Sequence, residues 1–333
     1  MPSKRLANYI ERLTPLNQRP SKPSDRPFNN ATAKNPPLLR PHGVNRILLY
    51  PGSFNPPHQG HLDLLKRVFE NAGVDLNIIA AIIVITDDER LTLKMETRDN
   101  AVVIPKDKRV KLWRGDGIPV DWAWVYDGSE ANWARLRARL TKEVQKDHME
   151  LKFIVLNGPD GVTADRGFNP ESWNCADSIT SDISRPVDFR YPSTLRQLAG
   201  CSPWERLKID RTRLEQQIRA KLRGQQTSVV EEVLAKAFKN LSIIWICRQQ
   251  RAKPKGIIRF LPYDLEKQSS DAPSSTKIRS IIERSSPDKL AENLRGIALH
   301  PKLLVEYLKE LPKPVKRVVL PEEKYDQKMP DDS

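Results

Sequence analysis

The chain has 333 residues, 38% of them hydrophobic and 29% charged, which is enough to bury the core of one large or two ordinary globular domains. Its longest apolar run, residues 78–85, is far shorter than the ~20 residues of a membrane-spanning helix, so we expect no membrane partner. The formal net charge is +14. Basic surfaces attract polyanions, so the charge favours nucleic acid or a nucleoside triphosphate as partner and leaves a merely solvated basic face as the alternative.

The cysteines point to a reducing compartment. Cys175, Cys201 and Cys247 are odd in number and show no C-x-x-C spacing. No apolar stretch near residue 1 resembles a secretory signal. Together these observations predict reduced thiols in an intracellular protein of the cytoplasm, the nucleus or both, and they argue against a cysteine-based zinc site.

The first 44 residues differ from the rest in composition. They hold eight of the 27 prolines, and eight Lys or Arg against two Asp or Glu. Beyond a short helix expected at 6–13, they show little periodicity. We therefore predict that residues 1–44 are a mostly disordered, basic, proline-rich arm whose removal leaves stability unchanged. Residues 313–333 form a polar C-terminal tail by the same criterion, which leaves 45–312 as the folded domain.

From residue 46 onward, apolar strands alternate with helices. We expect strands at 47–50, 78–85, 120–126, 151–156 and 241–247. Helices are predicted over 62–72, where apolar side chains recur at helical spacing, and over 130–145. Apolar strands separated by helices are typical of an α/β protein with a Rossmann-like parallel sheet covered on both faces. In such sheets ligands bind at the carboxyl ends of strands.

The stretch "GSFNPPHQGH" lies at one of these carboxyl ends. Gly52 permits close approach of the backbone to a ligand, and Pro56 and Pro57 stiffen the loop. If a helix begins near Pro57, His58 and His61 share one face of its first turn. Backbone N–H groups and the positive end of the helix dipole then point the same way, so the arrangement suits a triphosphate.

Three other interpretations of this stretch remain open. His-x-x-His is also half of a metal site, but the other histidines, His42, His148 and His300, have no ligand pattern nearby. The pair could be incidental turn residues, or the site could be inherited but inactive. Gly, Phe, Pro, His, Gly and His at fixed positions arise by chance about once in a million such chains, which favours a phosphate site.

A second motif, "PSSTKIR", covers residues 273–279. Ser275 or Thr276 is a natural N-cap for the helix that follows. Lys277 and Arg279 then occupy the first turn, where basic residues are mildly unfavourable unless a polyphosphate binds there. Taken alone, the motif favours an ordinary capped helix, and the phosphate site is preferred only beside the histidine loop.

Together the two motifs resemble the signatures of the HxGH nucleotidylyltransferases, and specifically the nicotinamide/nicotinate mononucleotide adenylyltransferase family. Weaker similarities are seen in "IPKDKRVKLW", "FIVLNGPDGV", "WICRQQ" and "HPKLLVEYLKEL". The resemblance spans roughly 46–160 and 241–311. The connection between them, about 161–240, is longer than is usual in the family, so we expect a partly helical insertion there.

The resemblance also implies a set of site residues. The residues implied for the ATP phosphates are His58, His61, Thr276, Lys277, Ile278 and Arg279, and the catalytic ones among them are His58, His61 and Arg279. The residues implied for the mononucleotide are Gly52, Ser53, Phe54, Gly158, Asp160, Trp173 and Lys94. A core tryptophan is the alternative for Trp173, and a solvated surface lysine is the alternative for Lys94.

The implied reaction is attack of a mononucleotide phosphate on the α-phosphorus of ATP, which forms NAD and releases pyrophosphate. A phosphate dianion needs no general base, so positioning and charge neutralisation would supply the catalysis. Mg²⁺ would arrive with ATP, because it keeps several waters and uses few protein carboxylates.

Departures from the family pattern leave the substrate open. Pro273 replaces an isoleucine, and "NGPDG" replaces a more usual Gly-Ala-Asp. The choices between nicotinamide and nicotinate, and between ATP and CTP, therefore stay open. Cytidylyl or adenylyl transfer to another phosphorylated acceptor is one alternative. A non-catalytic nucleic-acid-binding protein is another, disfavoured because the chain lacks interleaved aromatic and basic residues.

Overall fold

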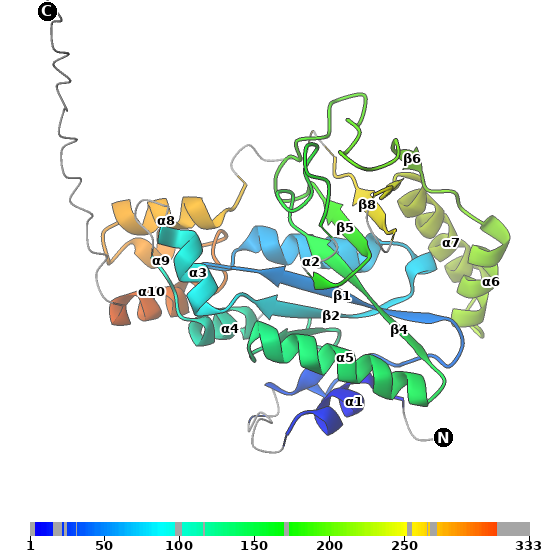
Figure 1. Cartoon of the computed structure of the whole chain (residues 1–333), viewed down its shortest axis with the longest axis horizontal. Coiled ribbons are helices and arrows are strands. Elements are labelled where there is room, and N and C mark those ends of the chain that lie inside the picture. Colours follow the sequence, from blue (N-terminus) through cyan, green and yellow to red (C-terminus); the bar gives the residue numbers. More distant parts are fainter. Residues whose placement is uncertain are drawn as a thin grey trace, which may run out of the picture.

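The computed structural model describes residues 4–15, 22, 25–30, 32–96, 102–115, 117–169, 173–251, 255–264, 266 and 272–311. An eight-stranded sheet in the order β3-β2-β1-β4-β5-β8-β7-β6 forms its centre (Figure 1). The strands are β1 (Val44–Gly52), β2 (Ile78–Ile85), β3 (Ala123–Tyr126), β4 (Glu150–Asn157), β5 (Asp177–Ser181), β6 (Glu205–Arg206), β7 (Trp245–Arg248) and β8 (Ile257–Leu261).

Six neighbouring strands, from β3 to β8, pair in parallel. Strand β7 pairs antiparallel with β8, and β6 pairs antiparallel with β7. The α/β, Rossmann-like parallel sheet expected from the alternating strands and helices is therefore confirmed, with an antiparallel extension at one edge.

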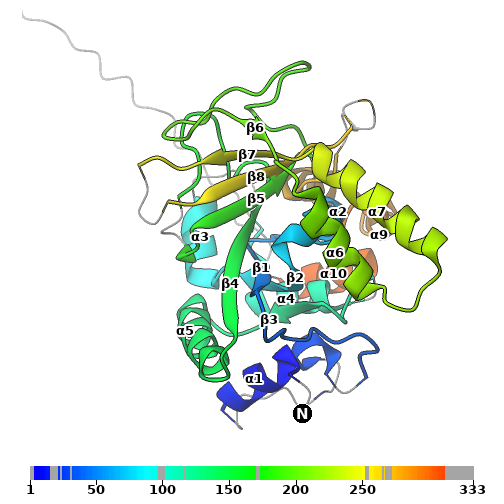
Figure 2. The same ribbon diagram turned by 90° about the vertical axis from the view of Figure 1, so that its right-hand side faces the viewer.

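Helices cover both faces of this sheet (Figure 2). The helices are α1 (Leu6–Leu13), α2 (Gln59–Asn71), α3 (Asp88–Glu96), α4 (Lys106–Arg114), α5 (Glu130–Lys146), α6 (Arg211–Lys221), α7 (Thr227–Ser242), α8 (Ser275–Arg284), α9 (Leu290–Asn293) and α10 (Pro301–Glu310), with the 3-10 turns η3 (Pro27–Asn29) and η4 (Val74–Leu76). No helix among the described residues combines the length and apolarity needed to cross a bilayer.

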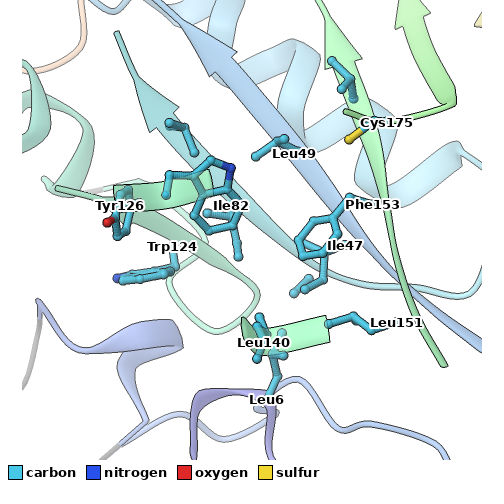
Figure 3. Close-up of a cluster of buried hydrophobic side chains, with 14 of the residues drawn as sticks. Leu6, Ile47, Leu49, Ile82, Trp124, Tyr126, Leu140, Leu151, Phe153 and Cys175 are labelled. Atoms are coloured by element: carbon cyan, nitrogen blue, oxygen red, sulfur yellow. The ribbon is translucent and has the colours of Figure 1, made fainter. Parts of the chain in front are cut away.

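Side-chain alternation along the strands divides the core into two layers. Ile47 and Leu49 of β1 face the layer that contains α1 and α5, part of which is shown in Figure 3. Leu48 and Tyr50 face the layer that contains α2, α4, α6 and α7. A third cluster joins α4 to α8, α9 and α10, which lie together near the carboxyl ends of β1 and β2 (Figure 1).

The N-terminal segment corrects one of the predictions. The helix expected at 6–13 is α1, but the described residues around it are not a disordered arm. Leu6 and Ile10 are fully buried in the same cluster as α5, and Phe28 lies 6.2 Å from the ring of Trp124. The apolar face of α1 finds enough buried area on the sheet layer to order the segment despite its prolines. The tail at 313–333 lies outside the described residues.

Several strands differ from expectation. Strand β3 begins three residues later than predicted, and β5, β6 and β8 were not predicted. The strand expected at 241–247 is wrong in its first half, because Leu241 belongs to the buried face of α7 and β7 begins only at Trp245. Strand β5 was missed because its sequence, "DSITS", is polar. Two of its buried hydroxyls are satisfied across the sheet: Asn157 donates to Ser178 Oγ at 2.6 Å, and Thr180 donates to the Asn157 carbonyl at 3.1 Å. The boundaries proposed for the domain and its insertion stay predictions.

Candidate active site

A cleft of about 650 Å³ opens where β1, β2, β4 and β5 end, within the size range of small-molecule sites. Its lining unites residues from both sequence motifs and from three further loops. The predicted residues that line it are Gly52, Ser53, Phe54, His58, His61, Lys94, Gly158, Asp160, Trp173, Thr276 and Arg279. The cleft lies at the edge of the sheet that the strand pattern indicated.

The loop after β1 depends on a glycine for its shape. Phe54 has a φ of 44°, and its ring folds back toward the end of the strand. A Cβ placed on Gly52 would come within 2.6 Å of that ring. The ring itself meets Tyr50 and Trp113 edge to face, at centroid separations of 5.1 and 5.0 Å. Gly52 is therefore required for the ring of Phe54 to form the floor of the loop.

The two histidines stack on each other at the start of α2. His58 is the N-cap residue, and the ring centroids of His58 and His61 are 3.5 Å apart at an interplanar angle of 24°. The backbone N–H of His58 donates to Nδ1 of His61 at 3.2 Å. Because Nδ1 accepts this bond, a neutral His61 carries its proton on Nε2, where it is a donor. Nδ1 of His58 is buried without a hydrogen-bond partner in the part of the chain that the structure describes.

Burial and positive charge keep both rings neutral. Burial, together with the nearby guanidinium of Arg185, lowers the pKa of His58 from 6.5 to about 3. Burial also holds the pKa of His61 well below its usual value, with His58 and Arg185 as added causes. At pH 7 the pair therefore offers neutral imidazole groups, whose charged forms become favourable only beside an anion.

The second motif contacts the first directly. Ser275 Oγ donates to the carbonyl of Pro56 at 2.9 Å, and Arg279 Nη1 donates to the carbonyl of Asn55 at 2.8 Å. The N-cap of α8 is Ser274, whose hydroxyl accepts the N–H of Lys277, and not Ser275 or Thr276 as expected. This shift by one or two residues frees the hydroxyl of Ser275 to hold the histidine loop.

The structure does not bring every predicted phosphate contact to the cleft. Ile278 is fully buried in the cluster between α8 and α10. The side chain of Lys277 borders a separate shallow hollow on α8 and α9. The backbone N–H groups of both residues already donate to Ser274. Their assignment to ATP stays a prediction, whereas Thr276 and Arg279 line the cleft.

The loop after β5 supplies a cation that sequence reasoning missed. Asp160, in the loop after β4, forms a 2.5 Å ion pair with Arg185, in the loop after β5. Burial alone would raise the pKa of the Asp160 carboxyl, but Arg185 lowers it below the usual value. Arg185 and its neighbour Ser184 both line the cleft. The signal that could have found them is the β-branched pair Ile179-Thr180, which makes the polar run before them a possible strand.

Lys94 and Trp173 complete the lining. Lys94 reaches from α3 and donates to Ser53 Oγ at 3.3 Å. Trp173 lines the cleft and also packs against the core cluster that contains α5. Its side chain is therefore part of the cleft wall and of the core at the same time. The cations of the lining are Arg90, Lys94, Arg185 and Arg279, against one carboxylate, that of Asp160, among the described residues. This balance favours a polyanionic ligand.

The described residues contain no group of three or more His, Cys, Asp or Glu placed to hold a metal ion.

Comparisons with known proteins agree in part with this geometry. Residues 49–163 match a family model described as cytidylyltransferase-like. No curated protein matches the sequence significantly.

Two solved structures of Plasmodium falciparum nicotinic acid mononucleotide adenylyltransferase, one complexed with NaAD and one with APC, are similar to the chain at 14% and 12% identity. The alignments cover 80% of this chain and 95% and 94% of those chains. Both TM-scores are 0.35, and a likeness this low supports no argument about function.

The matched residues include the strand, loop and helix that present His58 and His61, and they extend to Asp160 in the loop after β4. The parallel sheet places these residues at its carboxyl edge. Residues 49–163 are therefore similar to the cytidylyltransferase-like family, and they lie in a Rossmann-like parallel sheet.

Proposed function

We propose that the protein transfers AMP from ATP to nicotinamide or nicotinate mononucleotide, and so makes NAD or its nicotinate analogue together with pyrophosphate. The observation that carries the proposal is the meeting of the two motifs: Ser275 and Arg279 bind the loop that leads into His58. Residues more than two hundred positions apart thereby surround one cleft rich in cations.

The chemistry follows from that surrounding charge. An oxygen of the mononucleotide phosphate forms a bond to the α-phosphorus of ATP while the bond to the β-phosphate oxygen breaks. Negative charge grows on the departing pyrophosphate, which Nε2 of His61 and the guanidinium of Arg279 are suited to neutralise. The attacking phosphate is already a dianion, so no residue has to remove a proton.

The remaining lining residues fit the acceptor. The carboxylate of Asp160 is suited to accept hydrogen bonds from ribose hydroxyls, beside the open backbone of Gly158. Lys94 and Ser53 are hydrogen-bonded to each other and can share a phosphate. The partly buried ring of Trp173 offers a surface on which a pyridine ring can stack.

Magnesium enters this scheme as part of the substrate. Mg²⁺ prefers oxygen ligands, keeps most of its waters and binds ATP phosphates in solution. The carboxylate of Asp160 is of the ligand type that Mg²⁺ prefers, whereas the neutral, stacked histidines are not. The residues present therefore fit a cation that is carried mainly by ATP and only assisted by the protein.

The test is a substrate panel with the full chain. Purified protein is incubated with Mg²⁺ and either ATP or CTP against nicotinamide mononucleotide, nicotinate mononucleotide and a set of other phosphorylated acceptors. Pyrophosphate release is measured, and products are identified by mass spectrometry. We expect turnover with ATP and at least one of the two pyridine mononucleotides, and none when Arg279→Met replaces the parent.

One observation favours a second candidate, cytidylyl transfer, because the family model that matches residues 49–163 is described as cytidylyltransferase-like. The CTP arm of the same panel separates the two. Turnover with CTP and a non-pyridine acceptor, without any product from the pyridine mononucleotides, would replace the first proposal by the second.

A further inference from the structure

A buried arginine outside the cleft lining connects two of the loops that form it. Arg109 lies on α4 and its side chain is fully buried. Its Nη1 donates to the carbonyl of Ser53 at 2.7 Å, and its Nη2 donates to the carbonyl of Thr86 at 2.9 Å. Its Nε donates to the carbonyl of Ile104 at 2.8 Å, and Nη2 also reaches Asp88 Oδ1 at 2.6 Å.

The acceptors place Arg109 at the catalytic edge of the sheet. Ser53 follows β1 and Thr86 follows β2, and both line the cleft. The two strand ends are also joined by a bond from the N–H of Thr86 to the carbonyl of Gly52, at 3.0 Å. A planar guanidinium directs several donors at fixed angles, so one Arg109 side chain can hold both loops in a single geometry.

A second set of contacts from the same segment holds Asn55, two residues further along the loop. The side-chain oxygen of Asn55 accepts the N–H of Ile104 at 3.0 Å, and its amide donates to Val102 at 2.7 Å. On the other side, Arg279 binds the carbonyl of Asn55. The loop at 53–55 is therefore held between residues 102–109 and α8, and the hydroxyl of Ser53 in turn receives Lys94.

We propose that Arg109 is a positioning residue for nucleotidylyl transfer: it fixes the loop at 53–55, and through it Lys94, at the phosphate-binding edge of the cleft. The inference rests on the function proposed above. Arg109 touches no substrate itself. Its effect is on geometry, and a displacement of about 1 Å at a reacting centre costs about 10²-fold in rate.

The chain contains a matched control. Arg259 on β8 is 7% exposed and binds the carbonyl of Ala72 and both carboxylate oxygens of Asp75. It is a buried, multiply bonded arginine like Arg109, but its partners lie at the opposite, amino end of the strands. Substitution of either arginine should therefore lower the stability of the protein. Only substitution of Arg109 should also displace the loop at 53–55.

The experiment compares Arg109→Lys with Arg259→Lys in the full chain, at a temperature where circular dichroism shows both to be folded. A lysine keeps the charge but offers a point donor in place of the planar fork. For Arg109→Lys we expect kcat/KM to fall about 10²-fold, because the loop that positions Ser53 and Lys94 is displaced. For Arg259→Lys we expect a lower Tm with kcat/KM within about threefold of the parent.

Hydrogen–deuterium exchange provides a readout that does not require turnover. Peptides covering residues 52–56 should exchange faster in Arg109→Lys and at the parent rate in Arg259→Lys. If Arg109→Lys does not fold, Asp88→Ala removes one of the four acceptors from a half-exposed position, and it should give the same changes at smaller size. A parent protein without turnover would overturn the proposed function, while the exchange data would still test Arg109.

Three results would overturn the inference. The first is kcat/KM within about threefold of the parent in folded Arg109→Lys. The second is an equal loss of activity in both lysine variants. The third is unchanged exchange at 52–56 in Arg109→Lys, or in Asp88→Ala where that variant stands in.

Discussion

His58 and His61 are weak bases held neutral in a cleft whose remaining charge is mostly positive. Their stacked rings leave Nε2 of His61 as a donor and Nδ1 of His58 without a partner in the described part of the chain. A buried polar atom without a partner is costly unless a ligand satisfies it. At the scale of single residues, the site is prepared for an anion that brings its own hydrogen-bonding capacity.

His61→Ala tests the role of one donor. If Nε2 stabilises charge that grows on the leaving pyrophosphate, kcat should fall about 10²–10³-fold while KM changes little. Steady-state kinetics with magnesium alone measures the effect, and circular dichroism checks the fold. His42→Ala, at an exposed position beyond the amino end of β1, is the matched control and should behave as the parent. Turnover of His61→Ala within about twofold of the parent would remove this histidine from catalysis.

ATP binding should be accompanied by proton uptake at pH 6. The pKa of His58 is about 3 and that of His61 is well below 6.5 in the free protein, and phosphate oxygens beside the rings raise both. Titration calorimetry in two buffers of different ionisation enthalpy measures the protons taken up. His58→Asn should reduce the uptake. Zero uptake or net release in the parent would contradict the placement of phosphate at these rings.

At the scale of elements, α1 shows how a segment of unpromising composition becomes part of a core. Its buried residues belong to the same cluster as those of α5. The start of α1 is also hydrogen-bonded to the chain that follows the helix: the N–H of Leu6 donates to the carbonyl of Pro37, and the N–H of Leu39 donates to the carbonyl of Lys4, both at 2.9 Å. The hydroxyl of Tyr9 donates to the carboxylate of Asp147 beyond the end of α5. These contacts are long-range, so composition within the segment carries little information about them.

Ile10→Ala measures what α1 contributes. Ile10 is fully buried, and truncation of such a side chain costs about 2–5 kcal/mol of unfolding free energy. Leu38→Ala, at a position 51% exposed, is the control and should cost less than about 0.5 kcal/mol. Urea denaturation of both variants gives the comparison. Equally small losses of unfolding free energy in both variants would show that α1 contributes little to stability, as expected of a disordered arm.

For the whole molecule, the neutral histidine couples stability to pH. The pKa of His58 is lowered from 6.5 to about 3 on folding. Below pH 6.5 the unfolded chain takes up a proton that the native state does not bind. The stability that the native state owes to a neutral His58 is therefore fully present above pH 6.5, and it decreases as pH falls from 6.5 toward 3.

The expected size follows from the same linkage. Between pH 7 and pH 5 the parent should lose about 2 kcal/mol more unfolding free energy than His58→Asn. Urea denaturation at the two pH values measures the difference, and saturating ATP should offset part of the loss by binding the native state. Identical pH dependence in parent and variant would show that His58 is not kept neutral by the fold.

The parts of the molecule that could be read from the chain are those decided by neighbours in sequence. Alternating apolar runs predict the parallel sheet, since burial of a strand depends on its own side chains. The histidine loop and the capped helix of the second motif are local as well: a glycine, two prolines and a serine set their backbone within a few residues. Most of the candidate site followed from these stretches.

What remained depended on residues distant in sequence that supply hydrogen-bond partners or buried area. Strand β5 is polar, and Asn157 on the neighbouring strand supplies the partners of Ser178 and Thr180, so Arg185 beyond the strand went unseen. The apolar face of α1 needed the surface of α5 before it could be ordered. In the sequence, Arg109 is one of several cations in a basic helix. Only the folded chain places the carbonyls of Ser53 and Thr86, after β1 and β2, within reach of its guanidinium. In each case the stabilising energy comes from a contact formed only in the folded chain.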